Sequence, residues 1–94
     1  MLRLVTIDLS QADLARFENY EAAVLSLLDG HNARLEMRLR SLDQQSETHL
    51  LYFADDQSFE EFLADPLRIA LRPEWDACGA TSVATEVEAV NYSD

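Results

Sequence analysis

Apolar and polar residues alternate along two stretches of the chain. Residues 34–40 read Arg-Leu-Glu-Met-Arg-Leu-Arg, and residues 82–90 read Ser-Val-Ala-Thr-Glu-Val-Glu-Ala-Val. A period of two is typical of a strand with one covered and one polar face. Residues 2–9 and 48–53 are instead mostly apolar and rich in branched or aromatic side chains, as central strands are. The pattern therefore predicts four strands, two central and two at the edges.

A helix is predicted between the first two strands. Apolar residues of this stretch recur at three- and four-residue spacing, which is the period of a helix with one buried face. Ser10 and Asp13 form a capping pattern, so we expect the helix to start at about residue 11. We expect it to run to Asp29 and Gly30, because glycine can take the left-handed conformation that ends many helices.

A second helix is predicted to begin at Ser58, where Ser58-Phe59-Glu60-Glu61 forms a full capping box. Pro66 cannot continue this helix without the loss of a backbone hydrogen bond. The helix therefore either stops near Asp65 or restarts with Pro66 in a new first turn. We favour a restart that continues through Leu71 and ends at Pro73.

The order strand, helix, strand, strand, helix, strand predicts a fold of the α+β class. Its usual solution is the ferredoxin-like β-α-β-β-α-β arrangement, a four-stranded antiparallel sheet with both helices on one face. The first and third strands lie centrally in that arrangement, in agreement with their apolar sequences. We expect a single domain over residues 1–94, because 94 residues suffice for one core and no linker interrupts them.

This fold leaves one face of the sheet without helices. The apolar residues of the central strands that point to this face need a cover, and a second copy of the chain is the simplest one. We therefore expect a homodimer.

The chain also resembles the dimeric α/β-barrel superfamily, and it is most similar to small bacterial members of unknown function. The resemblance rests on Phe17 and Tyr20 in the long first helix and on residues 47–53, 58–62 and 65–68. It implies a pair of ferredoxin-like sheets that close face to face. The superfamily includes cofactor-free monooxygenases, lactone isomerases, haem proteins and polyketide cyclases, so the resemblance implies no single reaction.

The charge of the chain limits its partners. Eighteen acidic residues stand against seven basic ones, all arginine, for a formal net charge of −11. Such a surface repels phosphate groups, so we expect no binding to nucleic acid or to a membrane surface. The sequence contains no apolar run of the roughly 20 residues that a membrane span needs, and no leader-like run at its start. We therefore expect a cytoplasmic protein.

Cys78 is the only cysteine of the chain, so it cannot form an intrachain disulfide, and we expect a small buried thiol. Neither this cysteine nor the two histidines show the spacing of metal ligands. A glycine-rich phosphate loop and a C-x-x-C motif are also absent from the sequence. The sequence therefore predicts neither a metal site nor a bound cofactor.

His49 is the residue whose chemistry best suits a catalyst. Strand alternation places it on the same face as Leu51 and Phe53, and Tyr52 on the opposite face. Partial burial there favours the neutral imidazole, which can act as a base. The alternative is a structural histidine whose ring is satisfied by hydrogen bonds. For His31, at the end of the first helix, we expect the structural role.

An arginine row on the second strand is a candidate for ligand binding. We expect Arg34, Arg38 and Arg40 to share one face of this strand, where Arg38 and the rest of the row can bind a carboxylate or an enolate oxygen. The alternative is that the row pairs with Glu86 and Glu88 of the last strand, across the subunit boundary.

Three aromatic residues, Tyr20, Tyr52 and Trp75, can line a ligand cavity because each combines an apolar ring with a polar group. Packing in the core or in an interface is the alternative for each. Together with His49 they predict a protein that binds or transforms a small aromatic or polyketide-like molecule between sheet and helices, without a metal. The alternative function is a non-catalytic dimer, structural or ligand-binding, and the sequence leaves open whether the protein is an enzyme.

Overall fold

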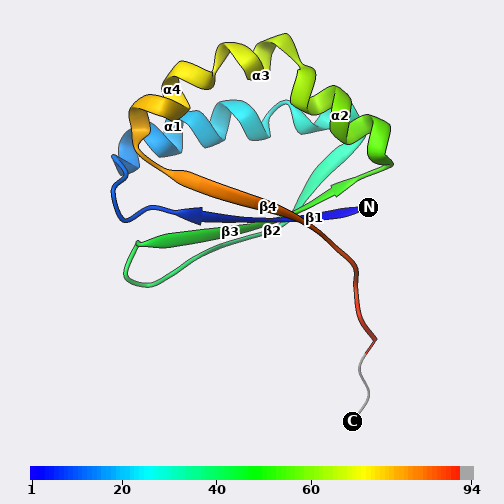
Figure 1. Cartoon of the computed structure of the whole chain (residues 1–94), viewed down its shortest axis with the longest axis horizontal. Helices are drawn as coiled ribbons and strands as arrows, with labels where there is room; N and C mark the ends of the chain where they lie inside the picture. The colour runs from blue at the N-terminus through cyan, green and yellow to red at the C-terminus, as the bar shows by residue number, and fades with distance from the viewer. Residues whose placement is uncertain (92–94) are drawn as a thin grey trace.

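The four predicted strands form one antiparallel sheet in the computed structural model, which describes residues 1–91. The strands are β1 (Leu2–Asp8), β2 (Ala33–Arg40), β3 (Ser46–Phe53) and β4 (Thr81–Val87), in the order β2-β3-β1-β4. β1 and β3 are therefore central, as their apolar sequences predict. Figure 1 shows the sheet from its side, with every helix above it.

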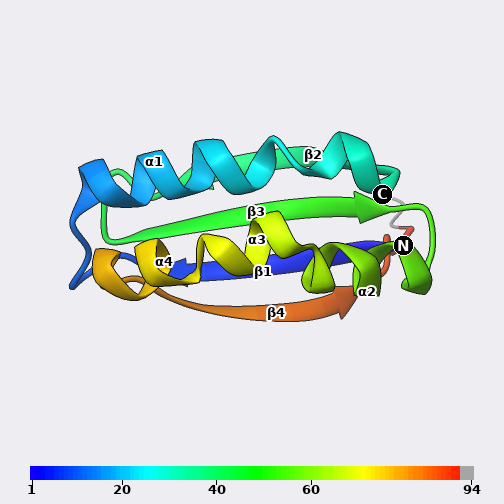
Figure 2. The ribbon, with the colours of Figure 1, turned by 90° about the horizontal axis from the view of Figure 1, so that it is seen from above.

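The helical layer contains more pieces than the sequence predicts. It consists of α1 (Leu14–Leu25), a 3-10 turn η1 (Leu28–His31), α2 (Asp56–Ala64), α3 (Pro66–Ala70) and α4 (Arg72–Cys78). Seen from above, α1 lies over the β2 side of the sheet, while α2, α3 and α4 follow one another over β1 (Figure 2). The ferredoxin-like α+β fold is therefore confirmed. No helix among residues 1–91 is long and apolar enough to cross a membrane.

The ends of the first helix differ from the prediction. The N-cap is Asp13, whose carboxylate accepts the Arg16 backbone N–H at 3.2 Å, whereas Ser10 lies outside the helix and donates to Asp8. The left-handed residue after η1 is Asn32 at φ 53°, and Gly30 remains inside the turn. Asparagine can replace glycine there because its short polar side chain tolerates this conformation.

The second helical region starts at Asp56, two residues before the predicted Ser58. Asp55 is the N-cap, and its carboxylate accepts the Ser58 backbone N–H at 2.8 Å. The restart at Pro66 is confirmed, with Asp65 as the cap of α3. Pro73 does not end the helical region, because it lies in the first turn of α4, where a proline has no backbone hydrogen bond to lose.

A β-bulge in β2 changes which side chains share a face. Leu35 is paired with Leu51, but Met37 is paired with Leu50, so Glu36 is an extra residue. After the bulge, Arg38 and Arg40 point toward the helices, whereas Arg34 before it points to the opposite face. The prediction that all three arginines share a face is therefore wrong, because the strand does not alternate regularly.

Helices cover one face of the sheet and leave the other face open. Under the helices, buried apolar residues form two clusters, one around Phe53 and Phe62 and the other around Phe17 and the thiol of Cys78. The burial of Cys78 is as predicted. The opposite face has no helix over it, and it carries exposed apolar side chains, among them Met37, Leu39 and Val83.

Candidate functional site

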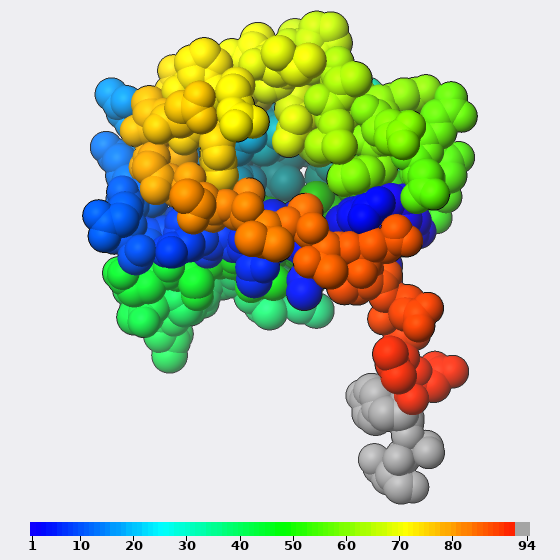
Figure 3. Space-filling view, in the orientation of Figure 1, coloured from blue at the N-terminus to red at the C-terminus, as the bar shows by residue number. Residues whose placement is uncertain are grey.

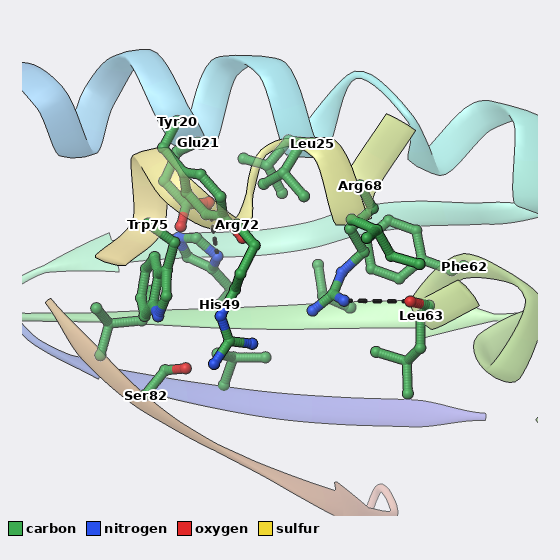
Figure 4. A pocket seen from close by; sticks show the side chains of 15 residues that line it. Tyr20, Glu21, Leu25, His49, Phe62, Leu63, Arg68, Arg72, Trp75 and Ser82 are labelled. Carbon is green, nitrogen blue, oxygen red and sulfur yellow. Dashed lines mark hydrogen bonds and ion pairs between the residues drawn. The ribbon is translucent and has the colours of Figure 1, made fainter. Parts of the chain in front are cut away.

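A cavity of about 410 Å³ lies between the sheet and the helices, where the two buried clusters meet. Its size is within the range of small-molecule sites. Three parts of the fold contribute its walls (Figure 4). They are the sheet residues Val5, Ile7, His49, Leu51 and Ser82, the α1 residues Tyr20, Glu21, Val24 and Leu25, and the residues Phe62, Leu63, Arg68, Ile69, Arg72 and Trp75 of the second helical region.

His49 lies at the sheet side of this cavity and is 2% exposed. It shares the helix-facing side of β3 with Leu51 and Phe53, as strand alternation predicts. Its Nε2 atom is 2.5 Å from Oε2 of Glu47, the residue two positions earlier on the same face. Its Nδ1 atom is 3.8 Å from Oε2 of Glu21 on α1. The imidazole therefore lies between two buried carboxyl groups.

Glu47 is held as a carboxylate by two arginines of the neighbouring strand. Arg38 Nε donates to Oε2 of Glu47 at 2.9 Å, and Arg40 Nε donates to Oε1 at 2.7 Å. The pairing of β2 with β3 places Arg38 opposite His49 and Arg40 opposite Glu47. Burial disfavours the charge of Glu47, but hydrogen bonds from His49, Arg38 and Arg40 outweigh it and lower the pKa of Glu47.

The protonation of His49 follows from these neighbours. Burial is the largest effect and lowers the pKa of His49, although the hydrogen bond and the charge of Glu47 act in the other direction. The ring is therefore neutral at physiological pH. Because an ionised carboxylate can only accept, the ring proton sits on Nε2 beside Glu47. Nδ1 then keeps its lone pair and can accept a proton.

Glu21 is the second unusual acid of the site. It is 4% exposed, and burial raises its pKa to about 7, with the charges of Glu47 and Glu18 acting in the same direction and Arg38 against it. Within residues 1–91, no hydrogen bond to its carboxyl group is formed in the structure. Near neutral pH, the carboxyl group of Glu21 therefore both binds and releases its proton. Its Oε2 atom is 3.8 Å from Nδ1 of His49, the nitrogen that keeps its lone pair.

The arginines of β2 connect the site to α1. Glu18 on α1 pairs with Arg40 and, at 3.3 Å, with Arg38. Glu86 of β4 pairs instead with Arg3, at 3.5 Å. Within the protomer β2 and β4 are opposite edges of the sheet, so the pairing of the row with Glu86 and Glu88 across the subunit boundary stays a prediction. Arg38 and Arg40 already pair with Glu18 and Glu47 inside the protomer, because the bulge turns both arginines toward the helices.

Three of the five candidate residues line the cavity and two do not. His49, Tyr20 and Trp75 line it, and the Tyr20 and Trp75 rings pack together with centroids 5.0 Å apart. Arg38 reaches it only through its hydrogen bond to Glu47. Tyr52 lies on the opposite face of the sheet, where the guanidinium of Arg34 stacks 4.2 Å above its ring.

Four charged residues of the site are not among the candidates from the sequence. The sequence does contain a signal for Glu47. It stands two residues before His49, and residues two apart in a strand lie side by side on the same face. Glu21 stands within the apolar stripe of α1, where a charge is unusual. Arg72 carries no signal, because α4 is not predicted. Arg68 lies in the predicted restart after Pro66, but its place at the cavity depends on how α3 packs over the sheet.

The remaining histidine does not line the cavity. His31 Nε2 is 2.7 Å from Oδ2 of Asp65, which ties the end of η1 to the start of α3. In the described part of the chain, no three histidine, cysteine or acidic side chains form a group that could hold a metal ion.

Solved structures share this fold. SnoaB, a cofactor-independent oxygenase from Streptomyces nogalater, matches with a TM-score of 0.72 and 16% identity over 95% of this chain and 93% of that one. A NIPSNAP domain protein from Burkholderia xenovorans matches with 0.67 and 20% over the full length of both chains. A proposed antibiotic biosynthesis monooxygenase from Nitrosomonas europaea matches with 0.67 and 8% over 93% and 98%.

The relationship is one of fold. No protein-family model matches the sequence, and no curated protein matches it either. Identities of 8 to 20% over almost whole chains show a common architecture and nothing finer. The chain therefore has the ferredoxin-like fold that these structures share, and this is the fold that the resemblance in sequence implies.

Proposed function

We propose that this protein binds a small aromatic or polyketide-like molecule in the cavity and transforms it without a metal, with His49 as the general base. The observation that carries the proposal is the position of His49. Its imidazole lines a cavity of ligand size, with Nε2 held by Glu47 at 2.5 Å and Nδ1 without a hydrogen bond among residues 1–91. A base needs this combination of a fixed orientation and an available lone pair.

The reaction step assigned to His49 is a proton transfer. Nδ1 takes the proton of an acidic C–H or O–H group of the ligand, and the electron pair of that bond stays on the ligand as an enolate or phenolate. Glu47 stabilises the imidazolium that forms, as the carboxylate of a catalytic triad does. Arg38 and Arg40 keep Glu47 ionised for this task.

Two of the structural neighbours support a reaction of this kind. SnoaB is described as a cofactor-independent oxygenase, and the Nitrosomonas protein as a proposed monooxygenase. Only SnoaB is described as cofactor-independent. At 16% and 8% identity, neither neighbour assigns a role to a residue of this chain. Molecular oxygen is therefore a co-reactant to include in assays.

A second copy of the chain is proposed as the cover of the open sheet face. Leu39 and Met37 on this face are 57% and 49% exposed, and the paired residues Leu4 and Leu50 lie between them and β4. Exposed apolar residues that adjoin across several strands usually mark an interface.

A structural role for His49 is the competing function. The network of Glu18, Arg38, Arg40 and Glu47 joins α1, β2 and β3, and His49 can serve it as a hydrogen-bond donor alone. In that case the protein is a non-catalytic dimer.

A screen of small aromatics and lactones by thermal shift tests the proposal, because a ligand stabilises the folded state by mass action. We expect hits that stabilise the unmodified protein, His49→Asn and Tyr52→Phe, which removes a polar group from the opposite face of the same strand. Exchange of the acidic hydrogens of these ligands with deuterated water should be lost in His49→Asn and kept in Tyr52→Phe. A screen without any hit, or an exchange that survives in His49→Asn, contradicts the proposal. In the unmodified protein, the ring signals in nitrogen NMR should report a neutral His49 with its proton on Nε2.

A further inference from the structure

The mouth of the cavity carries two arginines. Arg68 of α3 and Arg72 of α4 line it, and both side chains extend from the helices toward the sheet (Figure 4). The molecule is hollowed on this side, between the yellow segment of α3 and α4 and the orange strand β4 (Figure 3). A ligand that enters through this hollow passes the two guanidinium groups before it reaches His49.

Arg68 has few hydrogen-bond partners and no ion-pair partner among residues 1–91. Its Nε atom is buried and makes no hydrogen bond within residues 1–91. Its Nη1 atom donates to the backbone oxygen of Leu63 at 3.4 Å, and the group lies 5.3 Å above the ring of Phe62. A buried N–H without a partner is uncommon. In a chain with eighteen acidic residues, this arginine nevertheless pairs with no acid among residues 1–91.

Arg72 has only a weak partner. Its Nε atom is 3.3 Å from Oδ1 of Asp76, and both side chains are mostly exposed, at 71% and 65%. Exposed pairs of this kind contribute little to stability, so Arg72 can turn to a ligand at small cost. Ser82 of β4 lies across the mouth and offers a hydroxyl group.

We infer that the cavity takes an organic anion, whose carboxylate is bound by Arg68 and Arg72 at the mouth and whose aromatic body packs on Tyr20, Trp75 and Phe62. This inference rests on the proposed function, because it places the acidic C–H group of the same ligand toward His49. A guanidinium can bind a carboxylate through two parallel hydrogen bonds.

The charges inside the cavity permit such a ligand. Glu47 is already neutralised by Arg38 and Arg40, so it adds little repulsion. The net charge of −11 would otherwise repel an anion. The two arginines at the mouth are therefore the feature that makes anion entry favourable.

Phenylpyruvate and its methyl ester are a matched pair of probes. Both have an aromatic ring and an acidic methylene group, but only the acid carries a negative charge. Calorimetry on the full chain should show binding of phenylpyruvate at least tenfold tighter than that of the ester. Arg68→Gln should remove this preference, and Arg72→Gln should reduce it. Arg16→Gln, which makes the same change of charge on the exposed side of α1, should leave it intact.

Binding and proton transfer are read separately. Exchange of the methylene hydrogens with deuterated water, followed by NMR at saturating phenylpyruvate, reports the proposed base. His49→Asn should abolish the exchange and keep the preference for the acid. Equal binding of acid and ester, no binding of either at millimolar concentration, or a preference that survives in Arg68→Gln overturns the inference. Preference for the acid without any exchange in the unmodified protein leaves the anion site standing and contradicts only the base.

Discussion

The two faces of the sheet are built from alternate residues of the same strands, yet they have opposite characters. The face under the helices carries His49, Glu47, Arg38 and Arg40 in one hydrogen-bonded network beside a cavity. The opposite face carries apolar side chains without a charged network. The difference teaches that the strands divide two tasks between their two faces, and the bulge of β2 places Arg38 and Arg40 on the charged face. Charged groups with fixed partners make a site, and apolar groups without partners make an interface.

The largest effect is expected at the centre of the charged face. Glu47→Ala removes the shared acceptor of His49, Arg38 and Arg40 and should lower the free energy of unfolding by about 4 kcal/mol, the usual loss when one side of a buried ion pair is removed. Urea denaturation measures the change. Glu36→Ala is the matched control, because Glu36 forms its 2.5 Å pair with Arg34 at the surface, and it should cost less than about 0.5 kcal/mol. Similar losses in the two variants would remove the distinction between the faces.

The pH dependence of stability tests Glu21 on the same face. Its pKa is raised from 4.5 to about 7 in the folded chain, so the folded state binds the proton more tightly than the unfolded state does. Stability from this group is full below pH 4.5 and is lost as the pH rises through 7, by roughly 3 kcal/mol. Relative to the unmodified protein, Glu21→Gln should therefore gain stability between pH 5 and 8.

Other groups that face Glu21 titrate in both proteins. Glu18, Glu47 and His49 are common to the two, and Arg38 stays charged throughout, so the difference between the two denaturation curves isolates Glu21. A difference that does not change with pH would show that Glu21 has an ordinary pKa.

A substitution on the open face of the sheet should change the assembly of the protein. Leu39→Asp places a charge in the proposed interface and should weaken a dimer at least a hundredfold, about 2.7 kcal/mol. It should leave the folding of a monomer nearly unchanged, because Leu39 is already 57% exposed. Leu42→Asp is the control, since Leu42 is fully exposed in the turn after β2. Sedimentation velocity should give twice the chain mass for the unmodified protein and for Leu42→Asp. A monomer in the unmodified protein at micromolar concentration contradicts the dimer.

The smallest effect concerns the two arginines on either side of the bulge. Arg38→Gln loses charge-assisted hydrogen bonds to Glu47, and with the side chain 30% exposed we expect a loss of about 1 kcal/mol. Arg34→Gln loses only contacts at the surface and should change stability by less than about 0.5 kcal/mol. Denaturation of the two variants under one set of conditions compares them. Equal losses would indicate that both arginines lie on one face and that β2 has no bulge.

The sequence predicts the sheet well because strands follow a simple rule. A period of two in residues 34–40 and an apolar run in 48–53 specify both the strands and their places in the order β2-β3-β1-β4. Helix ends are predicted less well, because several capping residues compete. Asp13 and Asp55 form the caps, and the predicted Ser10 and Ser58 do not.

The site is predicted only in part, because its charges depend on contacts between distant segments. His49 is identifiable from its place in an apolar strand. Its partner Glu21 is 28 residues away on α1, and no local pattern brings the two together. Arg38 and Arg40 join the site through the bulge, which regular alternation does not predict. The cavity also needs α4, whose start after Leu71 depends on how Pro73 is accommodated.

The bulge in β2 also bears on how the gene for this chain can gain or lose a codon in evolution. Glu36 is one extra residue, and the bulge takes it up without changing the pairing on either side of it. Loss of its single codon would leave a regular strand in which Leu35 and Met37 keep their partners Leu51 and Leu50, and Arg38 stays opposite His49. A sheet can therefore absorb the insertion of one residue in a strand without moving its charged centre. Related genes that lack this codon would be expected to keep both arginines of the centre and the glutamate two positions before the histidine.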